Sequence, residues 1–418
     1  MRRLAIYGGK PLKGELTVQG SKNAALPILA ATLLSAEPCR VCNCPDLTDV
    51  HTAFQILEGL GARVDYNGFE AQISSANIRT PEICDALMCK MRSSVFFLGA
   101  MLSRFGKAKI GYPGGCALGA RPIDLHIKAM EQLGVTFQEE AGTITATLSR
   151  FRQGTVRLAF PSVGATENLL LLCAISKGET VILNPAKEPE IVDLQNFLNG
   201  MGAKIQGAGS DVIRIQGVHK LHGCSYRVMP DRVVAATYAS ATVACGGETL
   251  LRQTNPEHLT SFLEVLKRTG AEVDAQKAQL RIVMKERPYS VGMVKTLPYP
   301  GFPTDMQPLL MAALLQAKGT TVFYETIFEN RLRHVADFQR MGADIAADGQ
   351  IATVTGVGQL HGAKVRASDL RGGAALAIAG LSACGYTEIG DIGHIERGYV
   401  HLEEQLRLLG GDVALIED

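Results

Sequence analysis

Hydrophobic and polar positions along the chain repeat one pattern six times: a helix with one apolar face ends at a glycine, and a strand with alternating apolar positions follows. Glycine closes such a helix because it adopts the left-handed conformation without strain. Successive glycines are 68 to 73 residues apart, which predicts six repeats of about 70 residues each. These glycines are Gly61, Gly134, Gly202, Gly270, Gly342 and Gly410.

Each repeat has the same predicted order of elements. A short strand leads into a helix with apolar residues on nearly every side, as in residues 21–35 and 231–246, and such a helix is expected to be buried. A second strand follows, then the helix with one apolar face, then two alternating strands such as residues 203–206 and 212–215. The pattern predicts an α/β fold of six βαβαββ repeats.

The two ends of the chain predict the domain division. The sixth repeat stops after residues 411–416 without its last strand, whereas residues 4–7 form a spare strand at the start. We expect the N-terminal strand to complete the sixth repeat, which makes one domain discontinuous. Three repeats in each domain give residues 22–229 for one and residues 1–21 plus 230–418 for the other. Two chain crossings would allow a hinge over an interdomain cleft.

Composition excludes several classes of protein. The chain of 418 residues has 42 Lys+Arg against 41 Asp+Glu, a net charge of +1, which argues against binding to nucleic acid or to a membrane surface. No apolar run approaches the ~18 residues of a membrane span, and the first residues lack the hydrophobic region of a secretory signal. We therefore expect a cytoplasmic protein.

Ten cysteines in a chain without a secretory signal are expected to be reduced thiols rather than disulfides. Cys39, Cys42 and Cys44 form the tightest cluster. Cys39 and Cys42 make one CxxC spacing with no second pair to match it, so we expect buried structural thiols here rather than a metal site. No metal and no cofactor are predicted.

Cations gather at the predicted helix starts, where the helix dipole is already positive. Each such cation destabilises the helix by about 0.3–1 kcal/mol unless an anion binds beside it. In a nearly neutral chain, the pattern therefore predicts a small ligand with several negative charges. For any single cation, pairing with a nearby Asp or Glu is an equally good explanation. The residues are Lys22, Arg92, Arg121, Arg232, Arg331, Arg371 and Arg397.

Residues 111–122 interrupt the repeat with a glycine-rich segment that carries Cys116, five residues before Arg121. A thiol in a flexible loop beside a cation is biased toward the reactive thiolate, which makes Cys116 the chemical candidate. The glycine spacing matches neither GxGxxG nor GxxxxGK[ST], so neither nucleotide-binding motif is predicted.

Seven segments spread in order over nearly the whole chain carry a resemblance to a known family. The chain resembles the UDP-N-acetylglucosamine 1-carboxyvinyltransferases of the enolpyruvyl transferase family, and the cysteine loop is the specific part of the match. The sister 5-enolpyruvylshikimate-3-phosphate synthases share the six-fold architecture and lack this loop. The segments are residues 21–27, 113–126, 162–168, 188–193, 299–307, 328–331 and 396–404.

The resemblance implies an inside-out α/β barrel type of fold with the active site in the interdomain cleft. It also implies transfer of enolpyruvyl from phosphoenolpyruvate to the 3′-hydroxyl of UDP-N-acetylglucosamine, with release of phosphate, as the first committed step of peptidoglycan synthesis. The two small molecules are then the expected partners, and no cofactor is needed. Two alternatives remain: a shikimate-type transferase, and a nucleotide-sugar sensor without turnover.

The resemblance also assigns roles to single residues. Asp305 is implied as the general base and Cys116 as the acid, and Cys116 is further implied as the site at which fosfomycin inactivates the enzyme. Without the family match, Asp305 would be a charge that favours the first turn of a helix. Lys22, Arg121 and Arg397 are implied to hold phosphoenolpyruvate, with Arg92 and Arg371 nearby. The implied sugar-nucleotide residues are Asn23, Arg121, Pro122, Ile123, Asp124, Leu125, Ser162, Val163, Gly164, Asp305 and Ile327.

Overall fold

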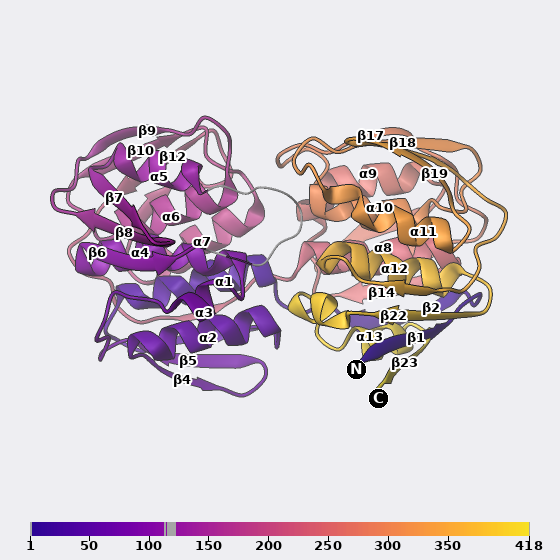
Figure 1. The fold of residues 1–418 in the computed structure, drawn as a ribbon, viewed down its shortest axis with the longest axis horizontal. Helices are drawn as coiled ribbons and strands as arrows, with labels where there is room; N and C mark the ends of the chain where they lie inside the picture. Colours follow the sequence, from indigo (N-terminus) through magenta and orange to yellow (C-terminus); the bar gives the residue numbers. More distant parts are fainter. Residues whose placement is uncertain (1, 113, 115–122, 418) are drawn as a thin grey trace. The chain divides into compact units, whose positions relative to one another are not determined.

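The computed structural model describes residues 2–112, 114 and 123–417. They form two compact units (Figure 1). One unit consists of residues 20–112, 114 and 123–229, and the other of residues 2–19 and 230–417. Cys116, Arg121 and Pro122 lie outside the described residues.

The first unit contains three sheets, and the strands in each of the following orders are hydrogen-bonded neighbours. The orders are β13 (Ser225–Arg227), β3 (Cys39–Cys42), β5 (Glu70–Ser74), β4 (Arg63–Tyr66); β6 (Lys107–Gly111), β8 (Thr143–Leu148), β7 (Val135–Glu140); and β11 (Lys204–Gln206), β12 (Val212–Gln216), β10 (Glu179–Leu183), β9 (Gly154–Arg157). In both four-stranded sheets one outer pair is parallel and the other pairs are antiparallel.

The second unit also contains three sheets, each with four strands. The orders are β15 (Glu272–Gln276), β16 (Gln279–Met284), β14 (Gly247–Arg252), β2 (Leu12–Thr17); β17 (Gly292–Lys295), β18 (Thr320–Tyr324), β20 (Ile351–Thr355), β19 (Asp344–Asp348); and β21 (Lys364–Arg366), β22 (Tyr386–Gly390), β1 (Arg3–Tyr7), β23 (Asp412–Ile416). Each sheet again has one outer parallel pair.

Helices rich in small apolar residues lie at the centre of each unit. In the second unit α8 (Arg232–Cys245), α10 (Gln307–Ala313) and α12 (Leu370–Ser382) pack against one another, and nearly all their residues are buried. In the first unit α4 (Phe96–Phe105) packs against both α1 (Lys22–Ala31) and α6 (Val163–Cys173). The apolar residues on all sides of these helices are thus explained by burial.

Apart from the one-turn α3, the remaining helices carry the single apolar face expected for a position over a sheet. Their bounds are α2 (Thr48–Leu60), α3 (Asp85–Met88), α5 (Asp124–Glu131), α7 (Pro189–Gly200), α9 (Thr260–Arg268), α11 (Val335–Arg340) and α13 (Leu402–Leu408). All six glycines of the repeated pattern have positive φ, between 83° and 109°, so their predicted left-handed conformation is confirmed. Among the described residues, no helix has both the length and the apolar character needed to cross a bilayer.

The N-terminal strand completes the last sheet of the chain, as the sequence predicts. Strand β1 lies between β22 and β23, where Leu4 pairs with both Ile389 and Leu415. This is the place that β12 occupies in its own sheet. The first and last strands of the chain are therefore antiparallel neighbours (Figure 1).

Because β1 has a strand on either side, we expect a core truncation in it to destabilise the second unit strongly. Ile6 is completely buried, and Ile6→Ala should lower the free energy of unfolding by about 2–5 kcal/mol in urea titration. Met293→Ala, at a side chain that is 64% exposed in the same unit, is the matched control and should leave stability nearly unchanged. Equal effects of the two substitutions would contradict the central place of β1.

Candidate functional site

Five of the predicted cations lie at helix or turn starts in the structure. Lys22 and Arg232 open α1 and α8, and Arg371 is the second residue of α12. Arg92 and Arg331 open two short 3₁₀ turns, η2 (Arg92–Val95) and η5 (Arg331–His334), which lead into α4 and α11. The predicted gathering of cations at helix starts is confirmed for these residues.

The predicted place of Arg397 is wrong in one respect. Arg397 is the last residue of the 3₁₀ turn η6 (Ile392–Arg397), and α13 begins only at Leu402. His401 has a left-handed conformation with φ 44°, and this separates the turn from the helix. The sequence predicts that this helix begins near Arg397.

Lys22 is buried rather than displayed on the surface. Its ammonium Nζ lies 3.1 Å from Oδ2 of Asp49, which belongs to the first turn of α2, and both side chains are buried. Ser21 caps α1 by accepting a hydrogen bond from the Ala24 backbone N–H, so the backbone that carries Lys22 and the half-buried Asn23 is fixed. Buried charges are costly unless paired, and Asp49 supplies the partner.

Two stretches assigned to the sugar nucleotide lie together in the first unit. Ser162 caps α6 through its side chain, which places Val163 and Gly164 in the first turn. A Cβ atom on Gly164 would lie 2.8 Å from Cε1 of His126, so only a residue without a side chain allows this approach. His126 belongs to α5, which Ile123 precedes and which Asp124 and Leu125 open.

His126 is held in this contact by Asn168 of α6. The Asn168 side-chain oxygen accepts a hydrogen bond from the Gly99 N–H at 2.7 Å, and its Nδ2 donates to the Val95 carbonyl at 3.1 Å. Nδ2 therefore also donates to Nδ1 of His126 at 2.8 Å, which leaves the proton of the neutral ring on Nε2. Burial, reinforced by the charge of Arg92, lowers the pKa of His126 to about 4.

The depressed pKa of His126 predicts a pH-dependent stability. The unfolded chain binds this proton near pH 6.5 and the folded chain only near pH 4, so the stabilisation is complete above pH 6.5 and is lost as pH falls toward 4. Between pH 7 and pH 5 the loss from this residue should be about 2 kcal/mol.

Urea titration at these two pH values tests the prediction with His126→Gln, which should lose less stability on acidification than the parent. The buried His334, whose pKa burial likewise lowers to about 4, keeps contributing in both proteins, so the difference isolates His126. The exposed His219 supplies the control His219→Gln. A pH dependence unaltered by His126→Gln would contradict the buried neutral ring.

In the second unit, two buried arginines hold the carboxylate of Asp305. Oδ1 lies 2.8 Å from a terminal nitrogen of Arg331, and Oδ2 lies 3.2 Å from Nε of Arg371. The arginine side chains are 1% and 3% exposed, whereas that of Asp305 is 30% exposed. Two guanidinium groups favour the ionised carboxylate, and its partial exposure leaves it accessible to a ligand.

A buried tyrosine orients Arg371. The guanidinium donates to the Tyr399 hydroxyl at 3.3 Å, and this hydroxyl is 2.8 Å from the hydroxyl of Thr237 in α8. Burial alone would lower the pKa of Arg371, but Tyr399, Asp305 and Asp231 together raise it, so the side chain stays charged. Arg371 is therefore a fixed cation behind Asp305.

Glu325 joins the segment of Ile327 to that of Asp305. One of its carboxylate oxygens accepts the Ile327 backbone N–H at 2.8 Å, and the other accepts the hydroxyl of Thr304, the neighbour of Asp305, at 2.9 Å. Glu325 itself is completely buried. The structure thus holds together two residues that the family match assigned to the sugar nucleotide.

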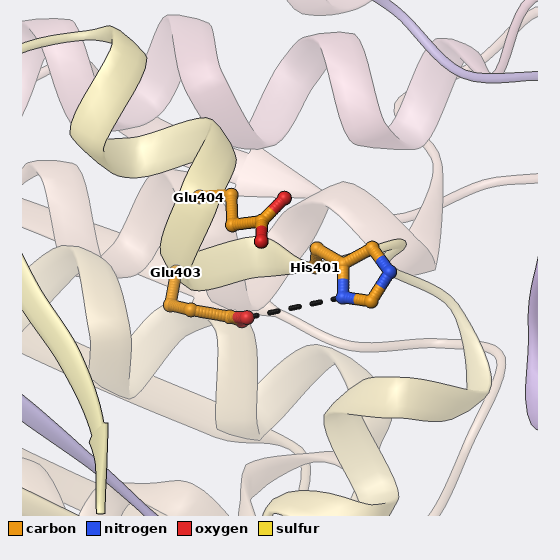
Figure 2. Close-up of side chains that lie close together, drawn as sticks. All are labelled: His401, Glu403 and Glu404. Carbon is orange, nitrogen blue, oxygen red and sulfur yellow. Dashed lines mark ion pairs between the residues drawn. The ribbon is translucent and has the colours of Figure 1, made fainter.

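One group of side chains in the described residues has the spacing of metal ligands. His401, Glu403 and Glu404 bring one ligand atom each within 4.8 Å of one another, and Nδ1 of His401 is 3.9 Å from Oε1 of Glu403 (Figure 2). His401 and Glu404 are exposed, and exposed acidic groups commonly occur without a metal. A surface ion pair accounts for the arrangement, so we assign no metal site.

The structure therefore brings some of the predicted residues together within each unit. In the first unit, residues 123–125 at the start of α5 lie beside residues 162–164 at the start of α6, and Lys22 pairs with Asp49. In the second unit, Asp305 pairs with Arg331 and Arg371, and Glu325 links its neighbour Thr304 to Ile327. Asp49, His126, Asn168, Glu325 and Tyr399 support these residues and were not predicted. His126 follows Leu125 directly in a segment that matched the family, which could have signalled it, whereas nothing in the sequence marks Glu325.

Comparison with known families decides the assignment. A family model described as EPSP synthase (3-phosphoshikimate 1-carboxyvinyltransferase) matches residues 6–406. The chain belongs to this family of enolpyruvyl transferases. Solved structures agree: the enolpyruvyl transferase NikO from Streptomyces tendae superposes with a TM-score of 0.90 at 25% identity, covering 99% of this chain and 98% of that chain. EPSP synthase from Acinetobacter baumannii has the same fold, with a TM-score of 0.77 at 20% identity and complete coverage of both chains.

Relatives within the enolpyruvyl transferase family are similar over their full length. A protein of Caldanaerobacter subterraneus named UDP-N-acetylglucosamine 1-carboxyvinyltransferase 2 is 47% identical over 416 residues, covering 100% of both chains. A protein of Thermotoga petrophila named UDP-N-acetylglucosamine 1-carboxyvinyltransferase is 45% identical over 419 residues, covering 100% of this chain and 99% of its own. The resemblance noted in the sequence is confirmed.

Proposed function

We propose that this enzyme transfers enolpyruvyl from phosphoenolpyruvate to the 3′-hydroxyl of UDP-N-acetylglucosamine and releases phosphate, the first committed step of peptidoglycan synthesis. The observation that carries the proposal is the full-length identity of 45–47% to relatives that bear the corresponding name. The shikimate-type reaction is the second candidate, because the matching family model is named for it. The cysteine segment around Cys116 favours the first.

The reaction requires one proton acceptor and one proton donor. The hydroxyl oxygen of the sugar bonds to C2 of phosphoenolpyruvate while its proton passes to Asp305, and Cys116 donates a proton to the methylene carbon. The tetrahedral adduct then returns a methyl proton to the Cys116 thiolate and expels phosphate, which takes up the proton held by Asp305, so that both residues regain their starting forms. Arg331 and Arg371 keep Asp305 in the ionised form that can accept a proton.

The substrates bring several negative charges, which require fixed cations. We propose that Lys22, Arg121 and Arg397 bind phosphoenolpyruvate. In this proposal, Arg92 and Arg371 add to the positive electrostatic potential around it. For the sugar nucleotide we assign Asn23, residues 121–125, residues 162–164, Asp305 and Ile327. Asp49 and Glu325 then act as positioning residues, since they hold Lys22 and Ile327 in place.

We infer further that the fold comprises six βαβαββ repeats of the inside-out α/β barrel type, three in residues 22–229 and three in residues 1–21 plus 230–418. One active site would draw residues from both domains across a cleft. The substrates are small molecules, and the proposal involves no nucleic acid, membrane, metal or cofactor. A cytoplasmic location fits substrates of this kind.

Phosphate release from phosphoenolpyruvate tests the proposal with each acceptor in turn. We expect release with UDP-N-acetylglucosamine and none above background with shikimate 3-phosphate. The reverse preference would establish the shikimate-type reaction. Binding of UDP-N-acetylglucosamine without phosphate release would indicate a sensor rather than an enzyme.

A further inference from the structure

Two thiols on neighbouring strands of the first unit take no part in the proposed reaction. Cys39 is the first residue of β3, and Cys224 directly precedes β13. These strands are parallel, and Ser225 pairs with Arg40. Cys39 and Cys224, one residue earlier in each segment, are therefore opposite one another. The Arg40 backbone N–H donates to the Cys224 carbonyl at 2.9 Å, which confirms this register.

Opposite residues of neighbouring parallel strands point to the same side of a sheet, and their strands are about 4.8 Å apart. This spacing lies within the range of about 4.4–6.8 Å between Cα atoms that a disulfide spans. Each thiol shifts the pKa of the other: Cys224 lowers the pKa of Cys39, and Cys39 raises that of Cys224. A bond between the two sulfurs therefore needs only a small rearrangement.

The neighbouring backbone holds the two segments close together. A Cβ atom on Gly223 would lie 2.0 Å from the Pro38 carbonyl oxygen, so glycine is required for this approach. Glu37 reinforces the contact by accepting the Gly223 N–H at 3.3 Å and by pairing with Lys220 at 3.2 Å. The relative placement of the thiols is thus determined by several independent contacts.

An open pocket leads to the pair. Both cysteines line this pocket of about 380 Å³, whose wall also includes Arg40; Cys39 is buried and Cys224 is half-buried. The hydrogen bond from Cys224, outweighing the opposing effect of burial, lowers the pKa of the Cys39 thiol, with a smaller contribution from the charge of His222. A thiol with a lowered pKa beside a second thiol is the arrangement found at oxidisable sites.

We propose that Cys39 and Cys224 form an oxidisable dithiol site that reacts with hydroperoxides to give an intramolecular disulfide. The Cys39 thiolate attacks one peroxide oxygen, so that an S–O bond forms, the O–O bond breaks and hydroxide leaves. The Cys224 sulfur then attacks the Cys39 sulfur and expels hydroxide, which takes up the Cys224 proton as water. In total, two thiols and hydrogen peroxide give one disulfide and two waters, and the peroxide takes the two electrons.

The disulfide would join β3 to the segment just before Met229 and Pro230, where the chain passes from one unit to the other. It would close a loop of nearly the whole first unit.

Non-reducing tryptic mapping of the full-length protein after hydrogen peroxide treatment tests the proposal. Cleavage after Arg40 separates Cys39 from Cys42 and Cys44, so the expected product joins peptide 23–40 to peptide 221–227. Cys42→Ser on the same strand should give the same product in equal yield. Cys224→Ser should abolish it and leave a Cys39 sulfenic acid that dimedone traps.

Two results would overturn the proposal. One is a peptide 23–40 that remains reduced while the exposed Cys84 and Cys89 are oxidised in the same sample. The other is linkage of peptide 23–40 to peptide 41–63, which would place the reactive pair within the Cys39–Cys44 cluster. Cys224→Ala, which should behave as Cys224→Ser does, guards against an effect of the introduced hydroxyl.

Discussion

Replacing Asp305 with Asn should reduce turnover by about 10²–10⁴-fold, the usual contribution of a general base, while UDP-N-acetylglucosamine binds with nearly unchanged affinity. The amide keeps the size of the side chain, and its single oxygen can still accept a hydrogen bond from one of the two arginines, Arg331 or Arg371, but it cannot take up the hydroxyl proton. Steady-state kinetics and calorimetric titration of the sugar nucleotide measure the two effects separately.

Asp305→Ala should likewise abolish turnover, but it also removes the anion between two buried arginines. The Asn variant is therefore the sharper test, and the unfolding midpoint of both variants shows how much of any loss is structural. Asp344→Asn, an exposed substitution at the start of β19 in the same unit, is the control and should keep full activity. Near-normal turnover of Asp305→Asn would mean that Asp305 only organises the arginines.

Fosfomycin should inactivate the enzyme completely by alkylating Cys116 alone among the ten cysteines. The prediction rests on the family resemblance and on the sequence around Cys116, where glycines and a nearby Arg121 favour a reactive thiolate. The phosphonate of fosfomycin resembles the phosphate of phosphoenolpyruvate. The proposed cations Lys22, Arg121 and Arg397 would therefore direct the epoxide of fosfomycin to the Cys116 thiol. Pre-incubation with UDP-N-acetylglucosamine should accelerate the labelling.

Tryptic mapping identifies the labelled residue directly, because the peptide that starts at Ile110 contains no cysteine other than Cys116. Cys116→Asp should remove the sensitivity to fosfomycin. Label on Cys39, Cys42 or Cys44, or unchanged inactivation of Cys116→Asp, would mean that the reactive segment and the proton donor have been misplaced.

The repeated pattern and its helix ends could be predicted from the sequence because local physics determines them. A glycine that ends a helix and a strand that alternates are visible within ten residues, as Gly61 and Gly410 illustrate. The strand at residues 4–7 could be placed as well. The last repeat lacks its final strand, and residues 4–7 are a spare strand that can fill this position.

Charge pairing across the fold could not be predicted in this way. Lys22 forms an ion pair with Asp49, and Arg331 with Asp305, because the fold brings the starts of separate helices or turns together. The residues next to each carboxylate in the sequence do not indicate this pairing. The sequence predicted cations at helix starts, but two explanations remained, ligand binding and pairing with carboxylates. The structure shows buried pairing for these two cations, and their proposed use in binding rests on the family.

The position of the transferred group tests the account most directly. After incubation with phosphoenolpyruvate and UDP-N-acetylglucosamine, mass spectrometry and NMR of the purified product should show one enolpyruvyl group on the 3′-oxygen of the sugar, with one phosphate released for each product molecule. An enolpyruvyl group found on shikimate 3-phosphate but not on the sugar nucleotide, when both acceptors are present, would contradict the proposed function.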